Sequence, residues 1–307
     1  PALLRHHRGS IITVSSMWGQ VDSVFTLTIV IIALLLSQGK TIPSYYVFAL
    51  GILLKPQTLV FTPLLLYGIY EHVFHKDFQW KKFYTNLLHG LLAIAGMLLA
   101  AMPYGLDKVI KQYGSTLGSY PYISVNAYNF WSFWGLNWSS QEKEFLFLTF
   151  AQLGTLIIVL LTILSALLFI RRMKHPEKYF LTGSFLIITM FMFSVRMHER
   201  YLFPGMILLL MAYVVSHKKV WLYSYFAFSF GHLLNVWHVL YHYDPHNYNA
   251  TATPIVVTSL FMIVTTVYYY VSIIRTGKQP AIIPTKESSP KSPILNKATD
   301  IFLGPKE

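Results

Sequence analysis

Long apolar segments recur along almost the whole chain, and they restrict its fold more than any other feature. A helix needs about 20 apolar residues to cross the hydrocarbon core of a bilayer, and several segments approach or exceed that length. The sequence therefore predicts an all-α, polytopic membrane helical bundle of about nine hydrophobic segments, some of them short or broken. The segments are Val21–Ser37, Pro43–Leu54, Thr58–Tyr70, Asn86–Met102, Phe145–Ile170, Tyr179–Val195, Leu202–Ser216, Val220–Leu240 and Pro254–Ile274.

The composition supports a membrane protein. Charged residues make up 12% of the chain, against about 25% in an average soluble domain. The chain has no cysteine, so neither a disulfide nor a thiolate metal site is predicted. The formal net charge is +12, but the basic residues gather in alternate loops, which is typical of membrane orientation. We therefore expect membrane lipid as a partner and no nucleic acid.

Two neighbouring segments, Pro43–Leu54 and Thr58–Tyr70, are each too short to span a bilayer. They can form one long tilted helix, or a hairpin of short helices with residues 55–57 at its tip. A single fused helix would place the basic loops Glu71–Lys82 and Arg171–Lys178 on opposite faces of the membrane. Because basic loops collect on the cytoplasmic side, the charge distribution favours the hairpin.

The chain reads as one membrane domain, residues 1–274, followed by a disordered cytosolic tail, residues 275–307. The tail is rich in Pro, Ser and Lys. The first 16 residues lack the apolar stretch and cleavage site of a signal peptide. We expect that further spans precede Pro1 in the complete protein.

Polar side chains stand at the edges of two apolar segments. Asp22 can cap the helix that follows it, or it can face a polar substrate. Gln20 and Trp18 are residue types found in sugar contacts. Lys55 is flanked by apolar residues, where a charge costs about 2.5–3.5 kcal/mol on insertion scales. It either extends its amine to the interface or, with Gln57, binds an anionic head group.

A polar stretch between two later segments predicts an anion site. It contains Arg196, His198, Glu199, Arg200 and Tyr201. Arginine binds phosphate through two parallel hydrogen bonds, His198 can donate a proton to a leaving oxygen, and Glu199 can orient an arginine. Arg196 and Arg200 are four residues apart, so we expect them to share one face of a helix. The alternative is a plain polar loop.

The long loop Pro103–Glu144 interleaves aromatic residues with Asn126 and Asn129. It is either an aromatic belt at the membrane interface or a surface that contacts the acceptor or lipid. Four histidines lie near one helix end, where Asp244 is the nearby carboxylate. We interpret them as a polar helix end and expect no metal site; they are His232, His238, His242 and His246.

Four motifs together indicate a family resemblance. They are WGQVDS at the start of a span, LLKPQ at a helix break, NAYNFW in the long loop, and MHERYLFP before a late span. In this order the chain resembles the multi-span GT-C glycosyltransferases that use lipid-linked sugars. It is most similar to bacterial mannosyltransferase-like members, which are related to the GPI-anchor and dolichol-pathway enzymes. The resemblance covers Pro1 to Ile274.

The resemblance implies transfer of a hexose, with mannose favoured, from a polyprenyl- or dolichyl-phosphate donor. The acceptor is a glycan, lipid or protein on the non-cytosolic face, the anomeric centre inverts, and neither a cofactor nor a divalent metal is expected. An acidic residue acts as base on the acceptor hydroxyl, while basic groups stabilise the departing phosphate. The candidate basic groups are Lys55, Arg196, His198 and Arg200.

Asp22 and Glu199 are the candidate catalytic carboxylates, and the sequence does not decide which of them approaches the acceptor. Such enzymes keep their principal carboxylate in the first outer loop, which we expect upstream of Pro1. Asp22 is therefore assigned to substrate binding or support, and activity of this chain alone is not implied. The remaining candidate substrate-binding residues are Gln20, Gln57, Asn126, Asn129 and Tyr201.

A second hypothesis is a polytopic transporter or lipid flippase, in which Lys55 and Arg196 would line a charged path. Transporters often contain internal repeats, and none is visible in the sequence. The two hypotheses differ in whether the polar motifs converge at one face or line a path through the bilayer. For the location, a bacterial plasma membrane is favoured over the endoplasmic reticulum.

Overall fold

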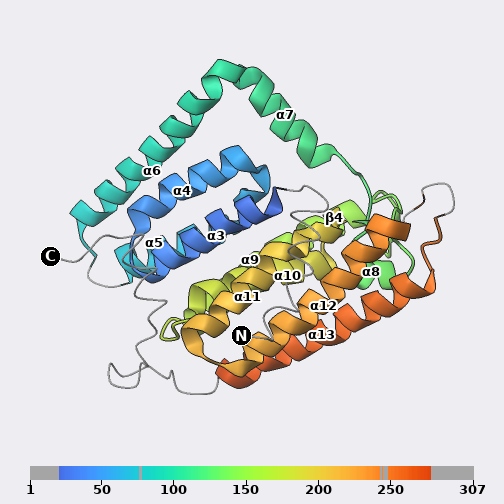
Figure 1. The fold of residues 1–307 in the computed structure, drawn as a ribbon. Helices are drawn as coiled ribbons and strands as arrows, with labels where there is room; N and C mark the ends of the chain where they lie inside the picture. Colours follow the sequence, from blue (N-terminus) through green and yellow to red (C-terminus); the bar gives the residue numbers. More distant parts are fainter. Residues whose placement is uncertain (1–20, 76–77, 243, 245–247, 278–307) are drawn as a thin grey trace.

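The computed structural model describes residues 21–75, 78–242, 244 and 248–277, and it is predominantly helical (Figure 1). The α-helices are α3 (Asp22–Ser37), α4 (Thr41–Leu54), α5 (Thr62–Ile69), α6 (Trp80–Ala101), α7 (Leu106–Gly118), α8 (Phe130–Phe133), α9 (Phe150–Arg171), α10 (Lys178–Phe193), α11 (Phe203–Ser216), α12 (Lys219–His242) and α13 (Thr253–Gly277). Shorter 3₁₀ turns are η2 (Pro56–Phe61), η4 (Met102–Tyr104) and η5 (Glu199–Leu202), and η3 (Tyr70–Phe74) is a π-helix. Four short strands complete the described fold: β1 (Ser124–Val125), β2 (Glu144–Phe145), β3 (Leu148–Thr149) and β4 (Met197–His198).

Four helices are long and apolar enough to cross a membrane: Trp80–Tyr104, Phe150–Arg171, Glu199–Ser216 and Thr253–Gly277. Three further apolar helices are shorter, namely α3, α4 and α10. The segment Val220–Leu240 forms most of α12, which has 24 residues, but α12 is not among the four. Its serines, histidines and Asn235 lower its apolar character. The last helix runs to Gly277, beyond the expected domain boundary at Ile274, and residues 278–307 lie outside the described part of the chain.

Successive helices run back and forth between two ends of the molecule. At one end the Lys55 side chain pairs with Asp22, at the start of α3. At the other end Arg172, after α9, contacts Glu177 before α10. We call these the Lys55 end and the Arg172 end.

Helix α4 ends at the Lys55 end for a local reason. Lys55 precedes Pro56, whose ring disfavours helical backbone in the residue before it. Lys55 accordingly has extended backbone, with φ −156° and ψ 115°. The chain then returns through η2, α5 and η3 to His72, whose Nε2 lies 2.9 Å from the Leu36 carbonyl oxygen at the far end of α3. The segments around residues 55–57 therefore form a hairpin.

The hairpin brings two basic loops to the same end of the molecule. Lys178 donates to the Glu71 carboxylate at 2.5 Å, and the Tyr179 hydroxyl donates to the same carboxylate at 2.9 Å. These contacts join η3 to the start of α10 at the Arg172 end.

A buried ionic group closes the Arg172 end. Lys218 Nζ lies 2.7 Å from Glu177 Oε1, and Arg172 Nη1 lies 3.5 Å from the same oxygen. Arg172 also donates to Thr276 Oγ1 at 2.8 Å. Arg172 and Glu177 are almost completely buried. The group therefore ties the α9–α10 and α11–α12 connections to the end of α13.

The apolar core lies among α3, α10, α11 and α12. Small residues allow close helix approach there, as is common where helices pack within a membrane. A Cβ atom added at Gly205 of α11 would lie 2.4 Å from Ile187 Cγ2 of α10. Glycine at this position thus sets the distance between α10 and α11.

Helices α6 and α7 form an arch beside α4, with its apex away from the rest of the bundle (Figure 1). Of the residues in α6, only Ala93 and Ala101 are buried. The Asn86 side chain holds α6 to the start of α4 by accepting from Thr41 and Tyr45 at 2.7 and 2.8 Å. Most of α6 consequently presents apolar side chains outward.

Candidate functional site

An alternating row of charges lies at the Lys55 end, and Asp22 is its centre. Asp22 is 1% exposed. Its carboxylate pairs with Lys55, and its Oδ2 lies 3.7 Å from Arg200 Nε of η5. Arg200 Nη1 in turn donates to Glu199 Oε1 at 3.2 Å. If all four groups are ionised, two cations and two anions give a net charge of zero, so each buried charge has an opposite neighbour.

Aromatic rings surround the two cations. Lys55 Nζ lies 5.5 Å from the centre of the Phe25 ring and 5.9 Å from that of Tyr201. Arg200 Cζ lies 5.8 Å from the Tyr201 ring centre. At these distances the ring faces attract the cations. Phe25 was not among the sequence candidates, although it lies one turn after Asp22 and so near the same helix face.

Three polar atoms of the site have no hydrogen-bond partner within the described part of the chain. They are Asp22 Oδ2, Gln57 Oε1 and Arg200 Nε. The other end of the Gln57 amide, Nε2, donates to the Tyr201 hydroxyl at 3.4 Å. Buried polar atoms are rarely left unpaired in proteins. Asp22 Oδ2 and Arg200 Nε face each other as an ion pair, and Gln57 Oε1 can accept a hydrogen bond from a polar ligand.

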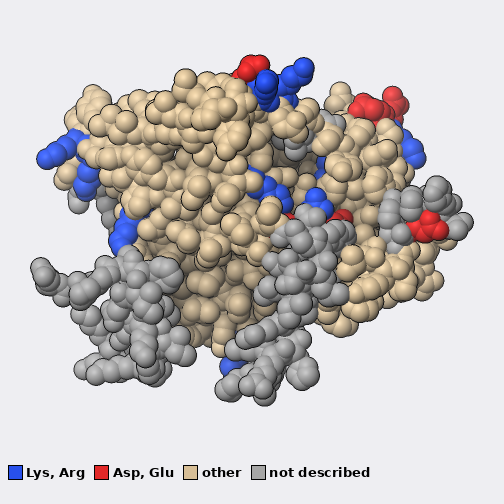
Figure 2. Space-filling model, turned by 45° about the horizontal axis from the view of Figure 1, so that its top comes forward, with Lys and Arg blue, Asp and Glu red and all other residues tan. Residues whose placement is uncertain are grey.

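Charged atoms are sparse on the face of the molecule shown in Figure 2, where most of the described surface is formed by uncharged residues. Near the centre of this view, Lys or Arg atoms lie beside Asp or Glu atoms, and further charged atoms lie toward its edges.

His198 is buried beside this cluster. Its ring centre lies 4.7 Å from that of Tyr120 and 5.0 Å from that of Tyr201. Burial, together with the nearby charges of Arg200 and Lys55, lowers the pKa of His198 to about 3. His198 is therefore neutral at pH 7. It cannot serve as one of the expected cations, although its N–H remains a hydrogen-bond donor.

Arg196 does not share a helical face with Arg200, so that expectation is wrong. The segment between them is not an α-helix, because β4 and the turn η5 follow Arg196. Arg196 has a left-handed backbone, with φ 61°, and its Nε donates to Gln141 Oε1 at 2.7 Å. Its side chain thus joins the loop after α7.

Asn126 and Asn129 have structural partners. The Asn126 side chain accepts from Trp138 Nε1 at 2.8 Å. Asn129 caps α8 by accepting from the backbone N–H groups of Trp131 and Ser132, both at 3.1 Å, and donates to the Phe191 carbonyl at 2.9 Å. Both residues therefore hold the loop that contains them in its fold.

That loop supports the site from the side. Strand β1 pairs with β4 in parallel, with Val125 opposite His198. The Asn235 amide of α12 donates to the Asn126 carbonyl at 2.8 Å and accepts from the Tyr128 backbone N–H at 3.0 Å. The loop consequently fixes the backbone that carries His198 and Glu199.

Two further predictions concern other residues. Gln20 lies outside the described residues. Among the described residues, no three His, Cys, Asp or Glu side chains are grouped so that they could hold a metal ion. His238 instead contacts the Tyr128 hydroxyl through Nδ1, at 2.5 Å.

The structure thus brings together Asp22, Lys55, Gln57, Glu199, Arg200 and Tyr201, and it places His198 against them. The loop beside the site is held in its fold by contacts of Arg196, Asn126 and Asn129. No family model, no curated protein and no solved structure matches this chain. The resemblance to GT-C glycosyltransferases therefore depends on the four sequence motifs alone.

Proposed function

We propose that this chain is a multi-pass membrane glycosyltransferase of the GT-C type. It transfers a hexose, with mannose favoured, from a polyprenyl- or dolichyl-phosphate donor to an acceptor on the non-cytosolic face. The observation that carries the proposal is the cluster of Lys55, Asp22, Arg200 and Glu199 at one end of the helices.

The two cations suit a phosphate leaving group. Negative charge grows on the lipid phosphate as the sugar departs, and preorganised cations in a buried site stabilise that charge. One carboxylate oxygen contacts Lys55, whose ammonium has three donors, and Arg200 has five. Both cations thus retain donors for a phosphate while Asp22 and Glu199 hold them in place.

The carboxylates also supply candidates for the base. A base must come within hydrogen-bond reach of the acceptor hydroxyl. Asp22 Oδ2 and Glu199 both lie within this cluster, and Asp22 Oδ2 has no hydrogen-bond partner among the described residues. Our proposal assigns Asp22 to holding the cations and the substrate, with Glu199 as the other candidate base.

The distribution of basic residues supports the orientation. The Arg172 end carries the larger set of cations, so by the positive-inside tendency it faces the cytosol. The Lys55 end then faces away from the cytosol. The larger set consists of Lys40, Lys81, Lys82, Arg171, Arg172, Lys174, Lys178, Lys218, Lys219 and Arg275, and the smaller set of Lys55, Lys108, Lys111, Lys143, Arg196 and Arg200.

The transporter hypothesis is less well supported. A charged transport path would place ionic groups along the helices, whereas the ion pairs of the described residues lie at the two ends. The core between them consists mainly of apolar side chains. This arrangement favours chemistry at one face over passage through the bilayer. A bacterial plasma membrane remains our proposed location.

The experiment is a transfer assay in membranes that contain the protein. Labelled polyprenyl-phosphate mannose and glucose are compared with the corresponding nucleotide sugars. We expect transfer from a lipid-phosphate donor only, and loss of transfer in Lys55→Met. Lys143→Met is the matched control, because Lys143 is an exposed lysine at the same end. A correctly folded protein without transfer from any lipid-phosphate sugar would falsify the proposal.

A further inference from the structure

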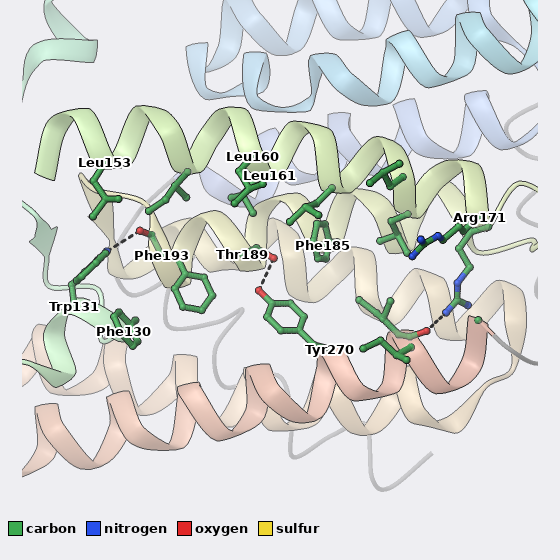
Figure 3. A pocket seen from close by; sticks show the side chains of 18 of the residues that line it. Phe130, Trp131, Leu153, Leu160, Leu161, Arg171, Phe185, Thr189, Phe193 and Tyr270 are labelled. Atoms are coloured by element: carbon green, nitrogen blue, oxygen red, sulfur yellow. Dashed lines mark hydrogen bonds between the residues drawn. The ribbon is translucent and has the colours of Figure 1, made fainter. Parts of the chain in front are cut away.

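A long apolar groove lies on the side of the bundle, away from the charged site. Its volume is about 1470 Å³, and it runs between α9 and α13 over α10 (Figure 3). Trp131 and Leu153 line it at the Lys55 end, and Arg171 lines it at the Arg172 end (Figure 3). Leu164 lines it between these ends, on α9. Leu153 and Arg171 are 18 residues apart on α9. At about 1.5 Å per helical residue this separation is about 27 Å, close to the thickness of a bilayer's hydrocarbon core.

Several polar groups on the wall of this groove are paired within the protein. Tyr270 donates to Thr189 Oγ1 at 2.8 Å, and Trp131 Nε1 donates to the Phe193 carbonyl at 2.8 Å (Figure 3). Arg172 donates to the Ile273 carbonyl. Between Trp131 and Arg171 the groove therefore offers its occupant a largely apolar surface.

Arg171 differs from the rest of the lining. Its side chain is exposed, and no hydrogen bond or ion pair joins it to any described residue. Neighbouring Arg172 is 1% exposed and paired with Glu177. An arginine at the end of an apolar groove extends its guanidinium toward the interface, where lipid phosphates lie. A guanidinium binds phosphate through paired, charge-assisted hydrogen bonds.

We propose that this groove binds an anionic phospholipid from the leaflet at the Arg172 end. One acyl chain lies along α9, α10 and α13, and the head-group phosphate pairs with Arg171. The occupant is expected to be anionic because Arg171 is a cation, and to carry a hydrocarbon chain because most of the groove wall is apolar. The site is separate from the Lys55 cluster, at the opposite end of the helices, and does not depend on the glycosyltransferase proposal.

The head-group contact is tested with the purified protein in detergent. Phosphatidylglycerol and phosphatidylcholine with identical acyl chains are titrated in, and bound lipid is counted by native mass spectrometry. We expect Arg171→Gln to weaken phosphatidylglycerol binding by about five- to tenfold, the effect of one cation on an anionic lipid, and to leave phosphatidylcholine unchanged. Lys219→Gln is the control, because Lys219 is an exposed cation at the same end but outside the groove.

The acyl-chain contact is tested with a matched pair of tryptophan substitutions. Leu164 lines the groove, whereas the adjacent Ile163 is exposed on α9 outside it. We expect Leu164→Trp to reduce retained lipid and Ile163→Trp to retain it. Equal phosphatidylglycerol binding in Arg171→Gln and the unaltered protein would overturn the proposal. A dimer that Leu164→Trp dissociates would also overturn it, because a second copy of the chain would then occupy the groove. Stronger binding of polyprenyl phosphate than of phosphatidylglycerol would overturn it as well.

Discussion

Asp22 and Lys55 form a buried ion pair although 33 residues separate them in the sequence. The Asp22 side chain is 2% exposed and the Lys55 side chain 13%. Removing two charges from water costs several kcal/mol for each ion, so a buried pair is weak evidence for added stability. Its position near Gln57 Oε1, which has no hydrogen-bond partner among the described residues, agrees better with a role in ligand binding.

Substitutions of Lys55 and Asp22 should affect stability and transfer activity differently. Lys55→Met leaves Asp22 with Arg200 alone, so we expect unfolding to become easier by about 3 kcal/mol, the low end for a broken buried pair. Adding Asp22→Asn removes the uncompensated charge and should restore most of that loss. Transfer should stay absent in both variants. Thermal unfolding in detergent, together with the transfer assay, measures the two effects, and activity in the double variant would contradict a binding role for the pair.

The two arginines of the polar stretch should differ in their effect on transfer. Arg200 lies beside Asp22, whereas the Arg196 side chain bonds to Gln141. We expect Arg200→Ala to lower kcat/KM by about 100- to 1000-fold, the usual effect of removing one preorganised donor. Arg196→Ala should lower it by about tenfold or less, through the loop. The reverse order would show that Arg196, and not Arg200, contacts the donor phosphate.

Burial of His198 predicts a pH dependence of stability. Its folded pKa of about 3 lies below the unfolded value of about 6.5, so the unfolded chain binds a proton in that interval and the folded protein does not. Stability therefore rises with pH between about 3 and 6.5, by up to about 1.4 kcal/mol per unit from this residue.

The measurement compares pH profiles of unfolding. His198→Phe should reduce the slope of the unfolding free energy against pH between pH 4 and 6.5, by the amount that corresponds to about one proton. His75→Phe, at an exposed histidine, is the control. If His198→Phe and the unaltered protein show parallel profiles, His198 is protonated in the folded state.

The glycines of the helices should tolerate alanine very differently. Gly205→Ala would place a Cβ 2.4 Å from Ile187, and overpacking of this kind costs about 1–3 kcal/mol. Gly96 of α6 has no atom within 4 Å of such a Cβ. Gly96→Ala should thus be neutral or stabilising by up to about 1 kcal/mol through helix propensity. Unfolding midpoints of the two variants test the α10–α11 contact.

A buried glutamate should stabilise the Arg172 end. Glu177 faces both Lys218 and Arg172, so Glu177→Gln leaves two cations without their shared anion. We expect a loss of about 3 kcal/mol or more. Glu144→Gln, at an exposed glutamate, should change stability by less than about 0.5 kcal/mol. Equal unfolding midpoints for the two variants would contradict a stabilising role of the Glu177 ion pairs.

Part of this structure could be predicted from local sequence. Most of the apolar segments correspond to helices, but the expected segment Phe145–Ile170 begins with β2 and β3, and α9 starts only at Phe150. Pro56 explains why Lys55 leaves the helix before it. The hairpin follows from the loop charges, because both basic loops must reach one end. The convergence of Lys55 with the polar stretch around Arg200 was expected because both were assigned to one lipid phosphate, and the structure joins them through Asp22 and Tyr201.

The roles of the loop residues could not be predicted in the same way. Arg196 has a left-handed backbone, with φ 61°, which local propensity does not indicate for arginine. Asn126 also has a left-handed backbone, with φ 59°, which asparagine adopts more readily than most residues, but the sequence does not show at which asparagine it occurs. Their partners, Trp138 and Gln141, come from tertiary folding of the long loop. The role of Asn235 in α12 could not be predicted either, because its partner, the Asn126 carbonyl of the long loop, is brought to it by tertiary folding.

Helix α3 touches both polar ends of the molecule. Its first residue belongs to the Lys55 cluster, and the carbonyl of Leu36 meets His72, which adjoins the Glu71–Lys178 pair. The helix has 16 residues, a length of about 24 Å. Because α3 is held at both ends, a shift of Asp22 along the helix axis would also disturb the contact between Leu36 and His72 at the Arg172 end.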